Sequence, residues 1–91
     1  MNKAEFVEQI ADKAELSRRD AELAVDATLK TIEEQLASGS EITLTGFGKF
    51  HVADRAARQG RNPQTGAPIE IKASRVPRFS AGAKLKQVVN G

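Results

Sequence analysis

The sequence predicts an α+β fold in a single domain that spans residues 1–91. Three observations support this prediction. Apolar residues recur at helical spacing over about residues 1–40, which form the helical part. Strand-like sequence follows over about residues 41–80, as a short sheet and a long basic arm. A last helical pattern occupies about residues 81–90.

Two helices are expected in the helical part. The first runs from about Lys3 to Ala14, and Asn2 with Glu5 three residues later has the form of an Asx N-cap. The second begins after Ser17, which repeats this capping signature. It ends near Ser38-Gly39, because glycine tolerates the left-handed conformation that follows a helix.

A β-hairpin is expected next. Apolar and polar residues alternate in Ile42-Thr43-Leu44-Thr45 and in Lys49-Phe50-His51-Val52, and Gly46-Phe47-Gly48 between them is a tight turn. Phe47 is interpreted as a core plug at this turn, the alternative being an aromatic that faces a ligand. His51 is interpreted as a surface strand residue, because no nucleophile or orienting carboxylate is patterned around it.

Charge is distributed unevenly along the chain. Residues 1–41 hold ten acids and five bases, a net charge of −5. Residues 42–91 hold two acids and nine bases, a net charge of +7, and the two halves together give the overall +2. Such an asymmetry in so short a chain points to a nucleic acid or another anionic surface as the partner of the second half.

The most basic stretch runs from Arg55 to Arg78. It carries six cations against one acid, Glu70, and Gly60, Pro63 and Gly66 punctuate its middle, where the chain can reverse direction. The flanking β-type runs have too few large apolar side chains to bury two faces, and an isolated hairpin is marginal in water. A basic ribbon held out towards a polyanion is therefore predicted.

A homodimer is expected from the small size of the core. One copy offers roughly a dozen large apolar residues, which leaves little margin once about 1–2 kcal/mol per residue is spent on ordering the backbone. The second helix also has apolar residues outside its main stripe, at Leu23 and Ala24, that could meet another subunit. A symmetric dimer would cover them and present two ribbons.

Several classes of protein and site are not expected. The chain has no cysteine and one histidine, so no metal site or disulfide is predicted. No apolar run approaches the roughly 20 residues of a membrane span, and no signal-peptide core follows the N-terminus. The sequence also has no glycine-rich phosphate-binding loop with a lysine. No nucleophile–base pair can be assembled from it either. The expectation is a cytoplasmic protein that is not an enzyme and needs no cofactor.

Two motifs carry a resemblance to a known family. The runs Gly46-Phe47-Gly48-Lys49-Phe50 and Gly60-Arg61-Asn62-Pro63-Gln64-Thr65-Gly66 resemble the bacterial HU and integration host factor family of histone-like DNA-binding proteins, and are most similar to HU. The opening Met1-Asn2-Lys3, Ala14-Glu15-Leu16-Ser17 and Val76-Pro77-Arg78-Phe79 are similar to that family as well. The resemblance extends from Met1 to about Val89.

The resemblance implies an intertwined homodimer with a helical base, a short β-sheet and two protruding β-ribbon arms. In that family the arms enter the minor groove of double-stranded DNA, and a proline near each tip wedges between base pairs. Transferred to this sequence, the wedge is Pro63. The other residues implied to bind DNA are Arg55, Arg58, Arg61, Asn62, Gln64, Lys72, Arg75 and Arg78.

The function expected from the resemblance is architectural. The protein would bind duplex DNA with little sequence specificity, prefer bent or nicked forms, and bend and compact DNA in the nucleoid. Alternatives are a site-specific bender like integration host factor and a protein-interaction module with a basic arm. Pro63 could instead be a simple turn residue. Ala67-Pro68, where many relatives have lysine, and the acidic Glu70 are departures that could weaken phosphate contact. Contributions of Arg18, Arg19, Lys84 and Lys86 are left open.

Overall fold

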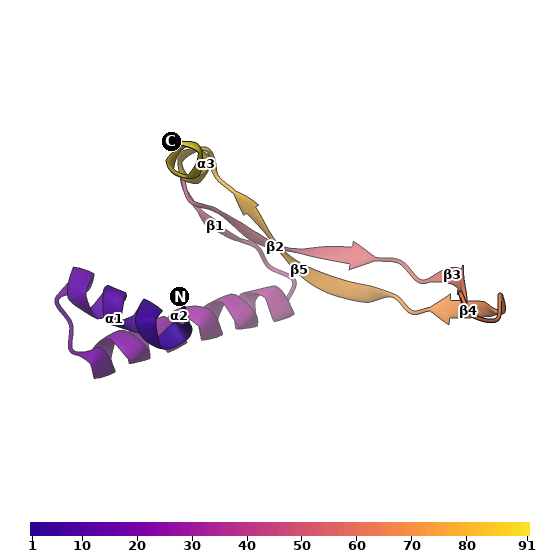
Figure 1. Ribbon diagram of the computed structural model, residues 1–91, viewed down its shortest axis with the longest axis horizontal. Helices are drawn as coiled ribbons and strands as arrows, with labels where there is room; N and C mark the ends of the chain where they lie inside the picture. The colour runs from indigo at the N-terminus through magenta and orange to yellow at the C-terminus, as the bar shows by residue number, and fades with distance from the viewer. The chain divides into compact units, whose positions relative to one another are not determined.

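The computed structural model describes residues 1–91, apart from the side chains of Arg58 and Ile71. Along the chain lie α1 (Lys3–Ala14), α2 (Arg18–Ala37), β1 (Ile42–Leu44), β2 (Gly48–Arg55), β3 (Arg58–Arg61), β4 (Pro68–Ile71), β5 (Ser74–Ala81) and α3 (Ala83–Asn90) (Figure 1). The expected α+β fold class is confirmed. The chain divides into two compact units, Met1–Gln35 and Leu36–Gly91, and the single domain over residues 1–91 stays a prediction. No helix among the described residues is long and apolar enough to cross a membrane.

The N-terminal unit is a pair of helices with the expected caps. Asn2 is in an extended conformation, and its side-chain oxygen accepts a hydrogen bond of 2.9 Å from the backbone N–H of Glu5. The hydroxyl oxygen of Ser17 accepts one of 3.1 Å from the backbone N–H of Asp20. Each cap satisfies an N–H that has no partner inside its own helix, so both predicted helix starts are confirmed.

The core of this unit is made of small apolar residues. Val7 and Ala11 of α1 and Ala21 and Val25 of α2 are buried, with Ile10 packed against them. Several large apolar side chains that the sequence offers for a core stay partly exposed instead. The exposed fractions are 47% for Phe6, 58% for Leu23 and 45% for Leu29. The buried set of one copy is therefore smaller than its apolar composition allows.

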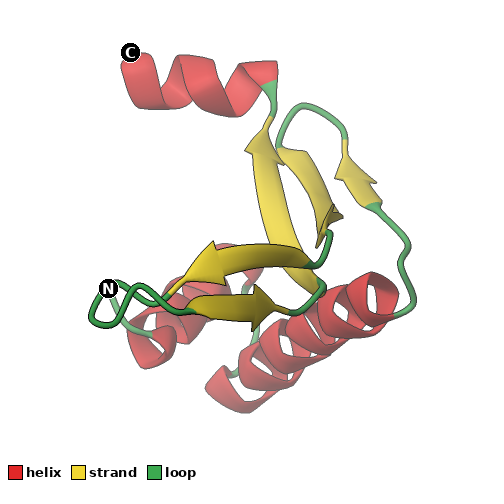
Figure 2. Ribbon diagram, turned by 90° about the vertical axis from the view of Figure 1, so that its right-hand side faces the viewer, coloured by secondary structure: helices red, strands yellow, loops and turns green.

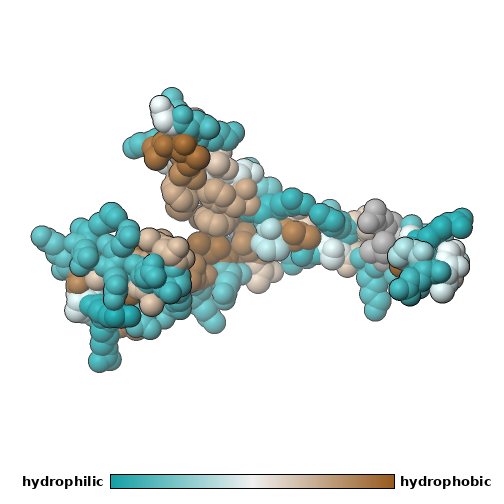
Figure 3. All heavy atoms as spheres, in the orientation of Figure 1, coloured by the Kyte–Doolittle hydropathy of each residue, from teal (hydrophilic) through white to brown (hydrophobic). Residues whose placement is uncertain are grey.

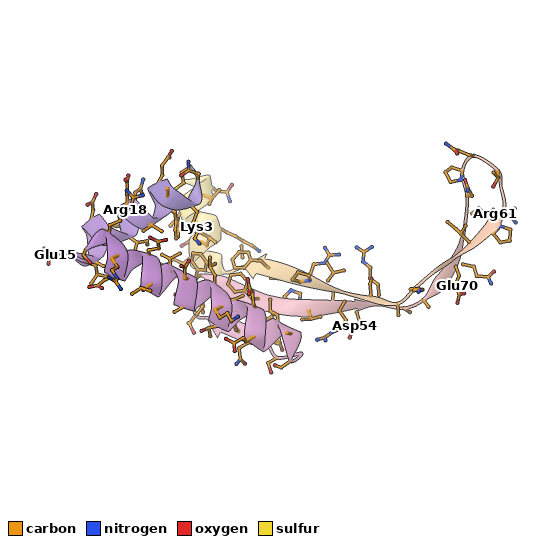
Figure 4. All side chains as sticks on the ribbon, turned by 90° about the horizontal axis from the view of Figure 1, so that it is seen from below. Lys3, Glu15, Arg18, Asp54, Arg61 and Glu70 are labelled. Carbon is orange, nitrogen blue, oxygen red and sulfur yellow. The ribbon has the colours of Figure 1, made fainter. Side chains whose placement is uncertain are left out.

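Ion pairs on the surface join the two helices. Lys3 lies 2.7 Å from Asp26, and Arg18 lies 2.9 Å from Glu8 (Figure 4). A hydrogen bond to the Asp26 carboxylate and its negative charge raise the pKa of Lys3 above its ordinary value. The sequence did not decide whether Arg18 contacts DNA. In the structure Arg18 forms an ion pair with Glu8 of its own unit.

The C-terminal unit contains two antiparallel ladders (Figure 2). The first is the sheet β1-β2-β5, in which β2 and β5 pair without interruption from Gly48↔Ala81 to Arg55↔Ser74. The second is β3-β4, paired from Arg58↔Ile71 to Arg61↔Pro68. Two residues on each side separate the ladders, Ala56-Ala57 and Lys72-Ala73. The predicted ribbon is thus present in two segments, and the small alanine side chains at the junction offer little cross-strand packing.

The turn between β1 and β2 holds α3 in place. The backbone N–H of Gly82 donates to the carbonyl oxygen of Phe47 at 2.7 Å, and that of Leu85 donates to Gly46 at 3.2 Å. The approach is close, because a Cβ on Gly82 would lie 2.8 Å from the carbonyl oxygen of Gly46. The ring of Phe47 packs against Phe79, with centroids 5.7 Å apart. Phe47 nevertheless remains 48% exposed in the single chain, so its interpretation as a core plug stays a prediction.

A strained residue connects α1 to α2. Glu15 follows α1 with φ 56° and ψ 44°, the left-handed conformation, and its backbone N–H bonds to the Ala11 carbonyl (Figure 4). A residue with a Cβ pays about 1–2 kcal/mol there, while glycine does not. Glu15→Gly should therefore raise the free energy of unfolding by about 0.5–1 kcal/mol, after allowing for the greater backbone freedom of glycine in the unfolded chain.

Urea unfolding at one fixed protein concentration measures this gain. Glu15→Ala is the matched control, because it removes the carboxylate but keeps the Cβ. Equal free energies of unfolding for Glu15→Gly and Glu15→Ala would contradict this prediction, because glycine would then relieve no backbone strain at position 15.

Candidate nucleic-acid interface

The sheet β1-β2-β5 has two chemically different faces. Residues directly opposite each other in an antiparallel pair share a face, and alternate residues of a strand point to opposite faces. One face therefore combines Phe50 and Val52 of β2 with Phe79 and Pro77 of β5, and we call it the apolar face. The rings of Phe50 and Phe79 lie 4.8 Å apart on it. Figure 3 shows hydrophobic residues gathered over this sheet, while hydrophilic ones cover much of β2 and β5 towards the arm.

The other face carries positive charge, and we call it the cationic face. It combines Lys49, His51 and Arg55 of β2 with Arg78 of β5, and Ser74 and Ser80 lie between them. Lys49, Arg55 and Arg78 are exposed, and His51 is partly buried. The nearest acid to Lys49 is Glu41, which precedes β1 and lies 3.0 Å from the ammonium. The small apolar pair Ala53 and Val76 lies between His51–Arg78 and Arg55 on this face. A face that gathers several cations is a suitable surface for a polyanion.

Arg75 differs from the other arm cations. It lies opposite Asp54, on the apolar face, and its guanidinium donates to the carbonyl oxygens of Leu36 at 3.2 Å and of Ala37 at 3.3 Å. These carbonyls are at the C-terminus of α2, where a positive charge is favourable because of the helix dipole. The nearby Gly39, with φ 85°, ends the helix as the sequence predicts. Arg75 thus has a structural role, and its predicted DNA contact is not needed to explain its presence.

The outer ladder also carries an acid. Glu70 lies opposite Gln59, and Pro68 lies opposite Arg61. Because opposite residues share a face, Arg61 and Glu70 are diagonal neighbours on the same face of the arm. The carboxylate reduces the positive potential at this point. Arg58, which the resemblance implies in DNA binding, lies outside the described side chains.

The tip of the arm is a tightly hydrogen-bonded turn. The backbone N–H of Asn62 donates to Ala67 at 2.8 Å, and that of Gly66 donates to Asn62 at 2.7 Å. The side-chain oxygen of Asn62 accepts from the backbone N–H of Gln64 at 2.9 Å, as in an Asx turn. Gly66 supplies the positive φ of 71° that this reversal needs. Pro63 is held exposed between these bonds.

The implied DNA-binding residues therefore fall into separate groups. Arg55 and Arg78 share the cationic face, while Arg61, Asn62, Pro63 and Gln64 are at or beside the tip. Lys72 lies at the junction of the two ladders, and Arg75 is on the apolar face. Lys49, His51 and Ser80 join the cationic face although the resemblance does not imply them. The alternation of Lys49 and His51 with Phe50 and Val52 is visible in the sequence, but which residues lie beside them depends on the pairing register.

Comparison with known proteins assigns this arrangement to a family. The model of the bacterial DNA-binding protein family matches residues 1–90. The chain belongs to this family. DNA-binding protein HU-beta 2 of Neisseria meningitidis is 50% identical over 91 residues, which cover 100% of both chains. DNA-binding protein HU of Streptococcus pyogenes is 53% identical over 88 residues, 97% of each chain.

A solved structure of a family member is also similar. In a co-crystal structure of Anabaena HU with DNA, the HU chain has a TM-score of 0.88 to this chain at 46% identity, and the match covers 98% of this chain and 97% of that one. The family resemblance noted in the sequence is thereby confirmed over nearly the whole length.

The two arginines of β5 should differ in their effect on folding. Arg75→Ala removes two charge-assisted hydrogen bonds to the end of α2 and should lower the free energy of unfolding by about 1 kcal/mol, a value reduced by the exposure of this side chain. Arg78→Ala, on the cationic face of the same strand, should change it by less than about 0.5 kcal/mol. Urea denaturation of both variants measures the difference, and equal losses would contradict the structural role of Arg75.

Proposed function

We propose that this chain is a non-enzymatic architectural protein that binds double-stranded DNA with little sequence specificity, and that it bends and compacts the DNA. The observation that carries the proposal is the cationic face, continued by Arg61 on the arm, in a chain whose relatives are named for DNA binding. The Anabaena relative was crystallised with DNA. These relatives favour this function over a site-specific bender and over a module that binds acidic proteins.

Binding would depend on phosphate neutralisation. Lys49, Arg55 and Arg78 present cations along one sheet face, and cations that neutralise phosphates release counterions whatever the base sequence. At the arm, Arg61, Asn62 and Gln64 are suited to the minor groove, which distinguishes A·T from G·C pairs but carries no full base code. The chemistry of these groups accounts for tight but weakly selective binding.

Bending would come from the arm tip. The turn closed by Asn62, Gly66 and Ala67 presents Pro63 to the outside on a short, hydrogen-bonded support. Insertion of an apolar side chain between base pairs is a known mode of minor-groove architectural proteins, this family among them, and unstacking costs about a few kcal/mol per step. DNA that is already bent or nicked has met part of this cost, so it should bind more tightly than intact linear duplex.

The functional form would be a homodimer with two arms, located with the nucleoid in the cytoplasm. Large apolar residues of a single chain remain partly exposed, among them Leu44 at 46%, Phe47 at 48% and Phe79 at 43%. Val88 and Val89 of α3 are exposed at 70% and 75%. Contiguous apolar residues at a surface usually mark an interface, and a second copy of this chain is the partner that would cover them in a symmetric assembly.

The dimer has a direct thermodynamic test. If folding and association are coupled, the thermal midpoint rises with protein concentration by mass action. Scanning calorimetry over two decades of concentration, with sedimentation equilibrium at each end, measures both quantities. A midpoint that does not depend on concentration, together with a monomer mass, would rule out the homodimer.

Phosphate neutralisation should appear in the salt dependence of duplex binding. Each phosphate neutralised contributes about −0.9 to the slope of log affinity against log salt concentration. Arg61→Ala and Arg55→Ala should each make the slope shallower by up to about this amount per subunit. Lys30→Ala, in the acidic N-terminal unit, is the charge-matched control.

Fluorescence anisotropy with a labelled duplex at several salt concentrations measures these slopes. Unlabelled duplex should displace the label, and polyglutamate of equal charge should do so poorly. Displacement by polyglutamate as efficient as by duplex would favour a protein-interaction module instead.

Pro63 should determine the shape of bound DNA but not the stability of the protein. Pro63→Ala removes the wedge while the arm cations remain, so the variant should retain most of its affinity for intact duplex and lose much of its preference for nicked duplex. Its free energy of unfolding should change by less than about 0.5 kcal/mol, because the residue is exposed. Pro68→Ala is the matched control, since Pro68 begins β4, lies opposite Arg61 of β3 and is outside the turn.

End-to-end energy transfer on a short duplex reports the bend, and anisotropy reports the two affinities. A Pro63→Ala protein that bends DNA like the parent, with the same ratio of nicked to intact affinity, would show that Pro63 is only a turn residue.

A further inference from the structure

The only histidine of the chain lies in the middle of the cationic face. His51 is directly opposite Arg78, and Lys49 and Arg55 point to the same side of β2. The ring nitrogen Nε2 lies 3.0 Å from the hydroxyl oxygen of Ser80, although 29 residues separate the two in sequence. A titratable ring and a hydroxyl are thus joined on the surface that faces DNA in the proposed function.

The hydrogen bond between these groups changes character when the ring is protonated. A neutral imidazole has one N–H donor and one acceptor, so either His51 or Ser80 can be the donor, according to the tautomer. A protonated ring donates from both nitrogens. Nε2–H then donates to the Ser80 oxygen, the hydroxyl hydrogen of Ser80 can turn outward, and Nδ1–H is a second donor. Protonation therefore creates a positive charge and leaves Nδ1–H and the Ser80 hydroxyl hydrogen available to donate to an anion.

The surroundings of His51 are mostly cationic. Arg78 faces it from β5, while Lys49, paired with Glu41, and Arg55 lie on its own strand. The carboxylate of Asp54 is on the opposite face, beside Arg75. From β1, the neutral Thr43 is paired with Lys49. Glu41 precedes β1, and the register of β1 with β2 continued by one residue places it level with His51, where its carboxylate is already paired with Lys49. Like charges directly opposite each other in a sheet are unfavourable, so an anion that contacts both a protonated His51 and Arg78 would be stabilised there.

We propose that His51 and Ser80 form a proton-linked phosphate site, in which the protonated ring, the Ser80 hydroxyl and Arg78 together hold one phosphate of the DNA backbone. The site rests on the proposed DNA-binding function and adds a regulatory property to it. A DNA phosphate favours the protonated ring, so binding takes up a proton. By linkage, affinity for DNA rises as the pH falls through the range in which histidine gains its charge, about pH 8 to 5.

Duplex affinity measured across this pH range at constant ionic strength tests the site. The wild-type protein should gain roughly threefold in affinity per subunit at the acidic end, as expected for one charge pair at the protein surface. The salt slope should also steepen by about 0.9 for each histidine that becomes a phosphate contact. His51→Gln, which keeps hydrogen-bonding groups but cannot be protonated, should show a flatter pH profile. His51→Lys should be flat and bind at all pH values with the steeper salt slope.

The Ser80→Ala variant tests the contribution of the Ser80 hydroxyl apart from that of the charge on the His51 ring. This variant should keep a pH dependence, because the ring still titrates, but should bind more weakly than wild type at the acidic end. Circular dichroism at both ends of the pH range controls for folding of each variant.

Proton NMR provides an independent readout, since one histidine gives one pair of ring resonances. Saturating duplex should move the titration curve of these resonances to higher pH, and the effect should be smaller in Arg78→Ala. A wild-type pH profile identical to that of His51→Gln, or a titration curve that duplex leaves in place, overturns this site while DNA binding stands. Absence of DNA binding by the wild-type protein at every pH overturns the proposed function, and this site with it.

Discussion

The pairing of β2 with β5 is the constraint on which the rest of the C-terminal unit depends. Its register, from Gly48↔Ala81 to Arg55↔Ser74, assigns every side chain of the two strands to a face. A slip of one residue in one strand would place Arg78 among the phenylalanines and Arg75 among the cations. The close approach at Gly48 helps to hold the register, because a Cβ there would lie 2.7 Å from the Ser80 carbonyl oxygen.

The sheet separates most of its cations from its aromatic side chains, because the two kinds of residue lie on opposite faces. The cationic face and the arm carry most of the positive charge of this unit, while the phenylalanines of the apolar face pack with one another. Because little of the arm is buried, its order depends on local devices, above all the Asx turn at Asn62 and the positive φ of Gly66. The arm can therefore present Pro63 without a core of its own.

Much of the local structure was accessible from the sequence, and the site was accessible only in part. The caps at Asn2 and Ser17, the helix stop at Gly39 and the turn around Phe47 follow from residue types a few positions apart. The basic stretch and its proline-containing tip were equally visible. The grouping of cations was not, because Arg75 and Arg78 look alike in sequence yet lie on opposite faces.

By itself the sequence determined the helices, their caps, the reversal at the arm tip, the uneven charge and the family, because each depends on neighbouring residues or on composition. Only the tertiary structure decided the role of Arg75, which reaches carbonyls 38 and 39 residues away, and the contact of His51 with Ser80, 29 residues away. The physical reason is the same in both cases. Strand register converts positions that are distant in the chain into neighbours on one face, and no local pattern specifies that register.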